Sequence, residues 1–169
     1  MTDISTDDRA DLFKLGMRRL AAGVSLITTR DETGARHGLI ATSVTSVCLT
    51  PPSLLTCINK SASSHDTLVK AGFFCVNLLP EGADDIAMRF SSSRFRDVRF
   101  AEGNWSELET GSPVLEEALA SFDCRITNMV EASSHTIFIG EVVAVRLPPQ
   151  PIQPLVYIDG VFARCAHAA

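Results

Sequence analysis

Two long strand-like stretches joined only by a short polar turn constrain the fold of this 169-residue chain most strongly. Residues 122–130 and 136–146 are rich in apolar and β-branched side chains, and no helical segment separates them. Strands joined so closely pair antiparallel, because a parallel pair needs a crossover of about a dozen residues or more. A further hairpin at 155–163 turns at Asp159-Gly160. The chain is therefore expected to form antiparallel sheet rather than regular βαβ units.

Shorter segments fill in the rest of this architecture. Six or seven strands, with three or four short helices at the connections, favour a mainly β, antiparallel barrel. The polar and aromatic stretch 91–110 shows no clear period and is expected to be an ordered excursion or lid. Ser112-Pro113 is a favourable pair for the start of a helix. The further strands are expected at 24–29, 38–43, 45–49, 54–58 and 73–79, and the helices at 6–22, 65–71, 84–90 and 114–120.

Length and composition indicate one globular domain over residues 1–169, with the barrel at about 24–163. The net charge of −5 argues against a nucleic-acid partner or an anionic membrane surface. No apolar run approaches the roughly 18 residues that cross a bilayer, and the acidic N-terminus is unlike a targeting peptide. The five cysteines form no C-x-x-C pair, and four lie in apolar segments, which favours buried, reduced thiols. A cytoplasmic location is therefore expected.

A cluster of small polar residues lies between the strand at 54–58 and the helix at 65–71. Ser63 or Ser64 stands where a helix N-cap belongs, and the N–H groups of the following turn are free to bind an anion. Lys60 adds a positive charge, while Asn59 and Ser61 add compact donors that suit phosphate. The same residues also fit a capped helix beside a solvated lysine, so both interpretations stand.

Small side chains alternate through residues 38–47, G-L-I-A-T-S-V-T-S-V. Such a strand pair lets a planar ligand approach the backbone closely. Thr42, Ser43, Thr45 and Ser46 could donate hydrogen bonds to ring carbonyls or ring nitrogens. An ordinary edge strand rich in Thr and Ser explains the same pattern, so the ligand site is one of two hypotheses here.

Among the histidines, His135 is the candidate for chemistry, because it begins a strand after a polar turn, where imidazole can bind a ligand or transfer a proton. No second histidine or carboxylate stands at metal spacing from it, so no metal site is expected. His37 could face the same rim, His65 belongs to a first helical turn, and His167 has no expected role. The sequence contains no G-x-G-x-x-G, no P-loop and no G-x-S-x-G, which argues against Rossmann-type binding and serine hydrolysis.

Taken in order, several segments resemble the short-chain flavin reductases, whose domain is a flavin-binding split barrel. The matching segments span about residues 12–163, and it is their order rather than any one of them that is specific. They read R-R-L-A-A-G-V-S-L-I-T-T at 18–29, G-L-I-A-T-S-V-T-S-V-C-L-T-P-P at 38–52, I-N-K-S-A-S-S-H-D at 58–66, G-F-F-C-V-N-L-L at 72–79, A-M-R-F at 87–90, S-H-T-I-F-I-G-E-V at 134–142 and P-L-V-Y-I-D-G-V-F at 154–162. The resemblance implies an antiparallel Greek-key split β-barrel with short peripheral α-helices.

The resemblance also implies a homodimer that binds FMN or FAD, oxidises NADH or NADPH, and supplies reduced flavin to a partner monooxygenase. It places His135 near the nicotinamide side of the flavin ring and lets Arg89 reach the phosphate or the adenylate end of FAD. The other cofactor-binding residues that it implies are Ala41, Thr42, Ser43, Val44, Thr45 and Ser46 along the ring, Cys57, then Asn59, Lys60, Ser61, Ser63 and Ser64 at the ribityl phosphate, and Tyr157 and Phe162 as pocket wall.

The chain departs from the family pattern at two places. Ile40 stands where the family often has Thr, which removes one hydroxyl contact. Ser133-Ser134 replaces the usual Gly-Asp, so His135 lacks an acidic neighbour. Two other functions stay open: a non-catalytic flavin-binding module, and a self-contained flavoenzyme that reduces another small acceptor.

Overall fold

The computed structural model describes residues 6–149 and 151–165 and is built on a seven-stranded sheet. Every pairing in this sheet is antiparallel, in the order β3-β2-β6-β9-β10-β5-β4. The strands are β2 (Ser25–Arg30), β3 (Arg36–Ala41), β4 (Val44–Leu49), β5 (Pro52–Asn59), β6 (Phe73–Leu78), β9 (Ala120–Ala132) and β10 (His135–Arg146). A small sheet of β1 (Ala22–Gly23), β11 (Leu155–Ile158) and β12 (Val161–Arg164) lies beside it, as does a hairpin of β7 (Trp105–Glu107) and β8 (Pro113–Leu115).

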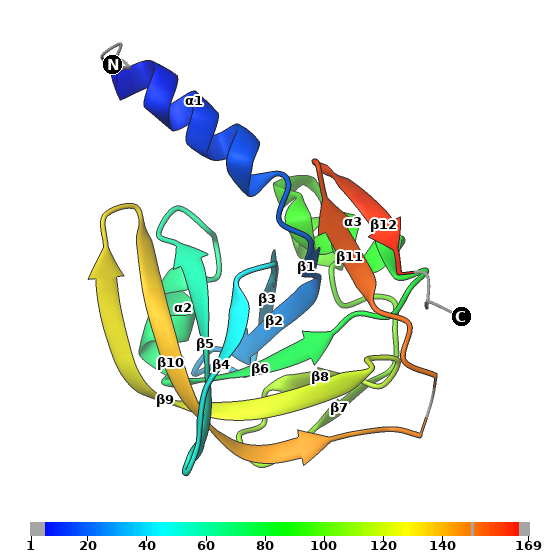
Figure 1. Ribbon diagram of the computed structural model, residues 1–169. Coiled ribbons are helices and arrows are strands. Elements are labelled where there is room, and N and C mark those ends of the chain that lie inside the picture. The colour runs from blue at the N-terminus through cyan, green and yellow to red at the C-terminus, as the bar shows by residue number, and fades with distance from the viewer. Residues whose placement is uncertain (1–5, 150, 166–169) are drawn as a thin grey trace.

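The large sheet curls into a barrel that is split along one seam (Figure 1). Its edge strands, β3 and β4, are joined by Thr42 and Ser43 alone, so the two edges of the sheet meet at that corner. Strands β6, β9 and β10 follow one another in space, and β10 then pairs with β5, which precedes them in the chain. This is Greek-key order. The predicted mainly β, antiparallel fold class is confirmed.

Two apolar clusters pack on opposite faces of the sheet. Successive side chains of a strand point to opposite faces, so Leu26 and Ile27 of β2 belong to different clusters. The Ile27 cluster also holds Phe74 and Phe138, both fully buried. Gly140 leaves room for Phe74, because a Cβ at that position would lie 2.9 Å from its ring. The clusters fix the curvature of the sheet and hence the position of the seam.

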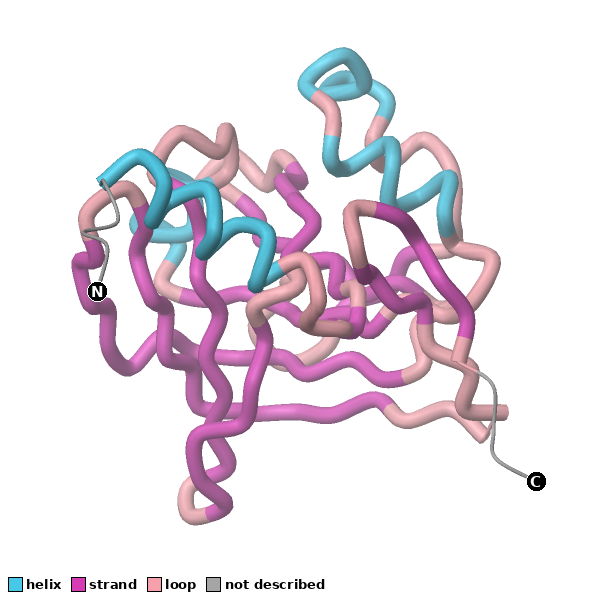
Figure 2. The backbone as a smooth tube through the Cα atoms, turned by 45° about the horizontal axis from the view of Figure 1, so that its top comes forward, coloured by secondary structure: helices cyan, strands magenta, loops and turns pink. Residues whose placement is uncertain are grey.

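The helices lie at the periphery of the strand framework, as Figure 2 shows. Helix α1 (Thr6–Met17) projects from the body, ends five residues before the predicted position, and is exposed along its described length (Figure 1). Helix α2 (His65–Ala71) follows β5 and ends at Gly72, whose φ of 74° is the left-handed geometry expected of a glycine C-cap. Helix α3 (Asp84–Ser91) leads into the 3₁₀ segment η1 (Ser93–Val98).

The helix predicted at 114–120 is wrong. Pro113 to Leu115 form strand β8, where Val114 and Leu115 are fully buried. The Leu115 N–H donates to the buried Asn77 side chain at 2.9 Å, and the Pro113 carbonyl accepts from the Thr28 hydroxyl. These long-range hydrogen bonds outweigh the local preference of a Ser-Pro pair for a helix start.

The cysteines are divided between core and surface, so the prediction of four buried thiols is only partly correct. Cys75 and Cys124 are buried, and burial raises the thiol pKa of Cys75 well above its usual value and that of Cys124 to about 12. Cys57 is half-buried and Cys48 is exposed. Within the described residues no helix is long and apolar enough to cross a membrane.

Candidate functional site

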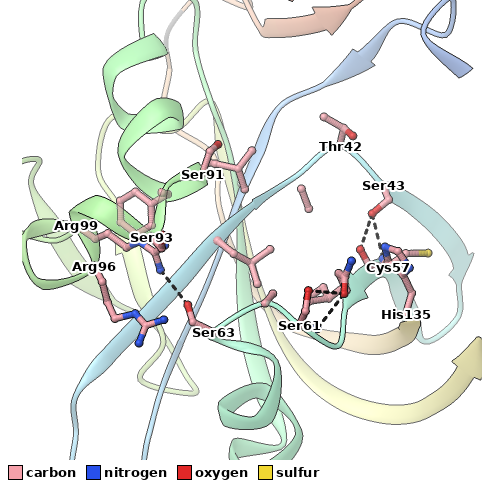
Figure 3. Close-up of a pocket in the computed structure, with 17 residues that line it drawn as sticks. Thr42, Ser43, Cys57, Ser61, Ser63, Ser91, Ser93, Arg96, Arg99 and His135 are labelled. Carbon is pink, nitrogen blue, oxygen red and sulfur yellow. Dashed lines mark hydrogen bonds between the residues drawn. The ribbon is translucent and has the colours of Figure 1, made fainter. Parts of the chain in front are cut away.

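A cavity of about 710 Å³ lies at the seam of the barrel (Figure 3). Residues 39–43, from the end of β3 and the β3–β4 corner, form one wall, and residues 57–59 of β5 with 61–63 form another. Residues from α3 and η1 close a third side, and His135 stands at the rim. The seam therefore brings together segments that lie almost one hundred residues apart in the chain.

The Ser43 hydroxyl holds the corner of the barrel to β5. It donates to the Cys57 carbonyl at 2.9 Å and accepts from the Cys57 N–H at 3.1 Å. These two hydrogen bonds continue the pairing of β4 with β5 by one residue beyond Val44, which lies opposite Thr56. Thr42 and Ser43 both line the cavity, as does Cys57, so these three predicted residues lie together.

The loop after β5 is shaped by the Asn59 side chain. Its amide oxygen accepts from the Ser61 N–H and from the Ser61 hydroxyl, both at 2.9 Å, which is an Asx turn. Asn59, Ser61 and Ser63 line the cavity. The sequence allowed two interpretations of this segment, a capped helix and an anion site. The N-cap residue of the helix, Ser64, makes no side-chain capping hydrogen bond. The loop therefore turns hydroxyl and amide groups toward the cavity rather than onto the helix.

His135 is the first residue of β10 and lies directly opposite Asn59 of β5 in the sheet. Its Nδ1 is 2.9 Å from the Ser134 hydroxyl. Ser133 has a φ of 50°, the left-handed region that Gly adopts more easily. Ser133 thus adopts left-handed geometry where the family usually has Gly, and the Ser134 hydroxyl lies beside the imidazole where the family usually has a carboxylate.

Two arginines at this site, Arg96 and Arg99, escaped the sequence analysis. Both line the cavity from the long excursion after α3. Arg99 is 7% exposed and donates at 3.0 Å to the Gly38 carbonyl and at 3.0 Å to the Ser92 carbonyl. Burial, and then the charge of Arg96, lower the pKa of Arg99. The only signal in the sequence was the aromatic and basic character of residues 94–100, which has no period that points to a cavity.

The cavity contains positive but no negative side chains. Arg96 and Arg99 supply the positive charge, and none of the lining residues is Asp or Glu. Across the described chain, no salt bridge joins Arg96 or Arg99 to a carboxylate. Hydroxyl donors beside unpaired guanidinium groups suit a phosphate, and small side chains such as Ala41 suit a flat ring. The donor set therefore fits a flavin nucleotide.

Several predicted residues lie outside this cavity. Val44, Thr45 and Ser46 of β4 line a separate, apolar groove with Phe122 and Val145 instead. They follow the corner after Ser43, where the chain turns away from the cavity. Only the first half of the predicted ring-binding segment, Ala41 to Ser43, reaches the cavity wall.

Two further predicted residues, Lys60 and Arg89, form ion pairs outside the cavity. Lys60 pairs with Glu131, and this hydrogen bond is the main cause of the lowered pKa of Glu131. Arg89 pairs with Glu102. Each of these two cations is engaged with an acid, and neither lines the cavity. The arginines that do line the cavity are Arg96 and Arg99.

The remaining predicted residues are buried or lie in another region. Ser64 is 1% exposed and donates to the Gly38 carbonyl at 3.2 Å. Tyr157 and Phe162 pack edge to face, 5.7 Å between ring centroids. Tyr157 lines an apolar groove beneath α1 that also reaches Thr42 and Ser43, so it lies near the corner but outside the cavity.

The other histidines have structural partners. His65 is buried, with Nε2 2.9 Å from the Thr136 hydroxyl and Nδ1 3.0 Å from the Asp66 carboxylate. His37 pairs with Asp31 and does not line the cavity. His167 lies outside the described residues. No group of three or more His, Cys, Asp or Glu residues in the described chain could hold a metal ion.

An antiparallel split barrel with a cation-lined, acid-free cavity at its seam defines the class of flavin-binding split barrels. The chain belongs to the flavin reductase-like family: its residues 17–166 match the family described as "Flavin reductase like domain". The predicted family is confirmed.

The chain resembles named proteins both in sequence and in fold. The chain is 39% identical to FMN reductase (NADH) RutF 2 of Rhizobium rhizogenes, over 92% of this chain and 88% of that protein. Its fold matches the styrene monooxygenase flavin reductase of Pseudomonas putida S12 with a TM-score of 0.84, at 28% identity over 93% of this chain and 99% of that one. It matches Streptomyces globisporus NADH:FAD oxidoreductase SgcE6, solved with NAD and FAD fragments, with a TM-score of 0.85, at 29% identity over 98% of each chain.

Proposed function

We propose that this protein is an NADH-dependent flavin reductase that binds FMN or FAD in the seam cavity. The observation that carries the proposal is the absence of any carboxylate among the residues lining a cavity that contains Arg96, Arg99 and His135. Relatives named as FMN reductases (NADH), at about 40% identity over most of the chain, support the same activity. The use of NADPH as a hydride donor remains a prediction.

A bound flavin would accept the hydride. The protein would supply binding and orientation. The small residues Ala41, Thr42 and Ser43 leave space beside the backbone at the end of β3 and at the corner, where a flat ring can lie. The Ser63 hydroxyl can donate to a phosphate oxygen, and Arg96 and Arg99 supply charge complementarity. His135, with Nδ1 held by Ser134, presents Nε2 at the rim where the nicotinamide must approach.

We further propose that the reductase acts as a homodimer that supplies reduced flavin to a separate monooxygenase. Helix α1 carries exposed Leu12, Phe13 and Leu15, and it projects from the body (Figure 1). Exposed apolar side chains on a projecting helix are stabilised when a second subunit covers them. A monooxygenase partner is supported by the neighbour named as a styrene monooxygenase flavin reductase. A single domain and a cytoplasmic location stay predictions.

Aerobic NADH oxidation, measured with and without added FMN, tests the function. Flavin-stimulated oxidation is expected, because oxidised FMN accepts the hydride of NADH and the reduced FMN that is released is reoxidised by oxygen. Binding of FMN without oxidation of NADH would favour the non-catalytic flavin module. Oxidation that proceeds on tightly held flavin and depends on another acceptor would favour the self-contained flavoenzyme. The absorbance spectrum of the purified protein shows whether flavin stays bound.

A further inference from the structure

A second recess, of about 560 Å³, adjoins the seam cavity and has no role in the function proposed above. The two share Ser63, Arg96 and Arg99, which form a ridge between them. Strand β3 runs beneath both. Its later residues, 39–41, line the seam cavity, and its earlier residues, 36–38, line the recess. A ligand that lies along β3 therefore passes over the ridge from one space into the other.

The ridge and recess are basic. Arg36 of β3 lines the recess together with Arg96 and Arg99 of the excursion, and the recess also contains Asp97 and His37. His37 is engaged by Asp31. Within the described residues no salt bridge joins a carboxylate, that of Asp97 included, to any of the three arginines. Three guanidinium groups thus face one carboxylate without pairing to it.

Arg99 is the least satisfied of the three. It is 7% exposed, and its Nε is buried without a hydrogen-bond partner. Its other two nitrogens bind neutral acceptors, the carbonyls of Gly38 and Ser92, while the Ser63 hydroxyl is 3.5 Å away (Figure 3). A buried guanidinium without a carboxylate is costly unless an anion completes it. Phosphate groups are the anions that arginine binds with two parallel hydrogen bonds.

We propose that the ridge binds the diphosphate of FAD and that the recess takes its adenosine, so that this reductase binds FAD more tightly than FMN. The inference rests on flavin binding in the seam cavity. A mononucleotide would occupy the seam cavity and present its phosphate to the ridge, whereas a dinucleotide continues past it. Phe100 and Ala101 line the recess beside Arg36, and an aromatic side chain with an arginine suits an adenine ring.

Equilibrium binding of FMN and of FAD, followed by flavin fluorescence, tests the inference. Wild-type protein is expected to bind FAD about tenfold more tightly than FMN, since only FAD can add contacts in the recess to those in the seam cavity. Arg36→Ala, at an exposed position that should tolerate the change, is expected to remove most of that advantage. Arg94→Ala is the matched control. It removes an exposed arginine of the same excursion that lines neither space, and it should keep the wild-type ratio.

ADP is the second probe: it should bind to the flavin-free protein and compete with FAD, and Arg36→Ala should weaken its binding as it weakens that of FAD. Equal affinity for FMN and FAD in the wild type, or an unchanged FAD-to-FMN ratio in Arg36→Ala, would overturn the inference. If Arg36→Ala instead raised only the KM for NADPH, the recess would bind the 2′-phosphate of NADPH and not the adenosine of FAD, and the inference would fail. In either case FMN-stimulated NADH oxidation would still uphold the proposed function, whereas loss of all flavin binding in the wild type would refute both.

Discussion

His135 and Asn59 lie opposite each other in the β10–β5 ladder, at the rim of the seam cavity. The pairing places the imidazole of His135 beside the amide of Asn59, which shapes the loop after β5. The adjoining ends of β10 and β5 thus contribute to both the nicotinamide side and the phosphate side of the proposed site. Since Asn59 organises Ser61 while His135 faces the rim, the two residues should affect different kinetic constants.

Replacement of His135 by Ala is expected to lower kcat with NADH about tenfold or more while changing the Kd for flavin much less. The imidazole is placed to stabilise the reacting rings, and such electrostatic contacts are felt mainly in the transition state. Steady-state NADH oxidation and flavin titration measure the two quantities separately. Ser134→Ala, which removes only the 2.9 Å contact to Nδ1, should have a smaller effect on kcat. An unchanged kcat in His135→Ala would exclude a catalytic role.

A negative charge at Ser63 is expected to weaken flavin binding about tenfold or more. Ser63 lies beside the guanidinium groups of Arg96 and Arg99, so a carboxylate in Ser63→Asp would repel phosphate and pair with the arginines. Ser64 is unsuitable for this test, because a carboxylate there would be buried against the Gly38 carbonyl. Flavin fluorescence titration gives the Kd. Asn128→Asp adds the same charge at an exposed position of β9 and should bind flavin normally. Equal affinity in both variants would remove Ser63 from the site.

A methyl group at Gly38 is expected to destabilise the fold by about 1–3 kcal/mol. An added Cβ would lie 2.8 Å from the Phe90 ring and 3.2 Å from the Ile27 carbonyl, so α3 would have to move away from β3. Chemical denaturation of Gly38→Ala gives the change in the free energy of unfolding. Gly16→Ala, in the exposed helix α1 with nothing within 4 Å, should instead stabilise by a few tenths of a kcal/mol or be neutral. Equal stability of Gly38→Ala and wild type would contradict the close approach.

The carboxyl of Asp123 is expected to make stability fall as pH rises through the weakly acidic range. Burial raises its pKa, although hydrogen bonds from the N–H and hydroxyl of Thr110 act in the opposite direction. A raised pKa means that the folded protein holds the proton to higher pH than the unfolded chain. The contribution is therefore fully present below the ordinary aspartate pKa of about 3.9 and is lost as pH rises through the raised value.

The free energy of unfolding of wild type and of Asp123→Asn, measured between about pH 4 and pH 7, checks this sign. The difference between the two proteins should shift in favour of Asn as the pH rises, because the amide carries no charge to bury. Glu32→Gln, at an exposed carboxylate in the turn between β2 and β3, is the control and should show little of this slope. A difference that does not change with pH would contradict the raised pKa.

The sequence by itself determined the elements whose causes are local. Asp159-Gly160 forms the last hairpin because both residues adopt positive φ, at 52° and 84°. Gly72 ends α2 for the same reason, and the short turn between β9 and β10 leaves an antiparallel pair as the only arrangement. Thr42 and Ser43 were predicted from a run of small side chains, Asn59 from a polar cluster and His135 from its position at the start of a strand, and the structure brings all four to one cavity.

Only the tertiary structure decided which charges that cavity contains. Lys60 and Arg89 look available in the sequence, yet the fold pairs them with Glu131 and Glu102, which lie 71 and 13 residues away. Arg99 looks unremarkable in the sequence, yet its guanidinium is buried against the Gly38 carbonyl, 61 residues earlier in the chain. Local preference sets where strands and turns occur, whereas the pairing of a charge depends on which distant segments the curled sheet brings together. For that reason the barrel could be predicted, and the cations of its cavity could not.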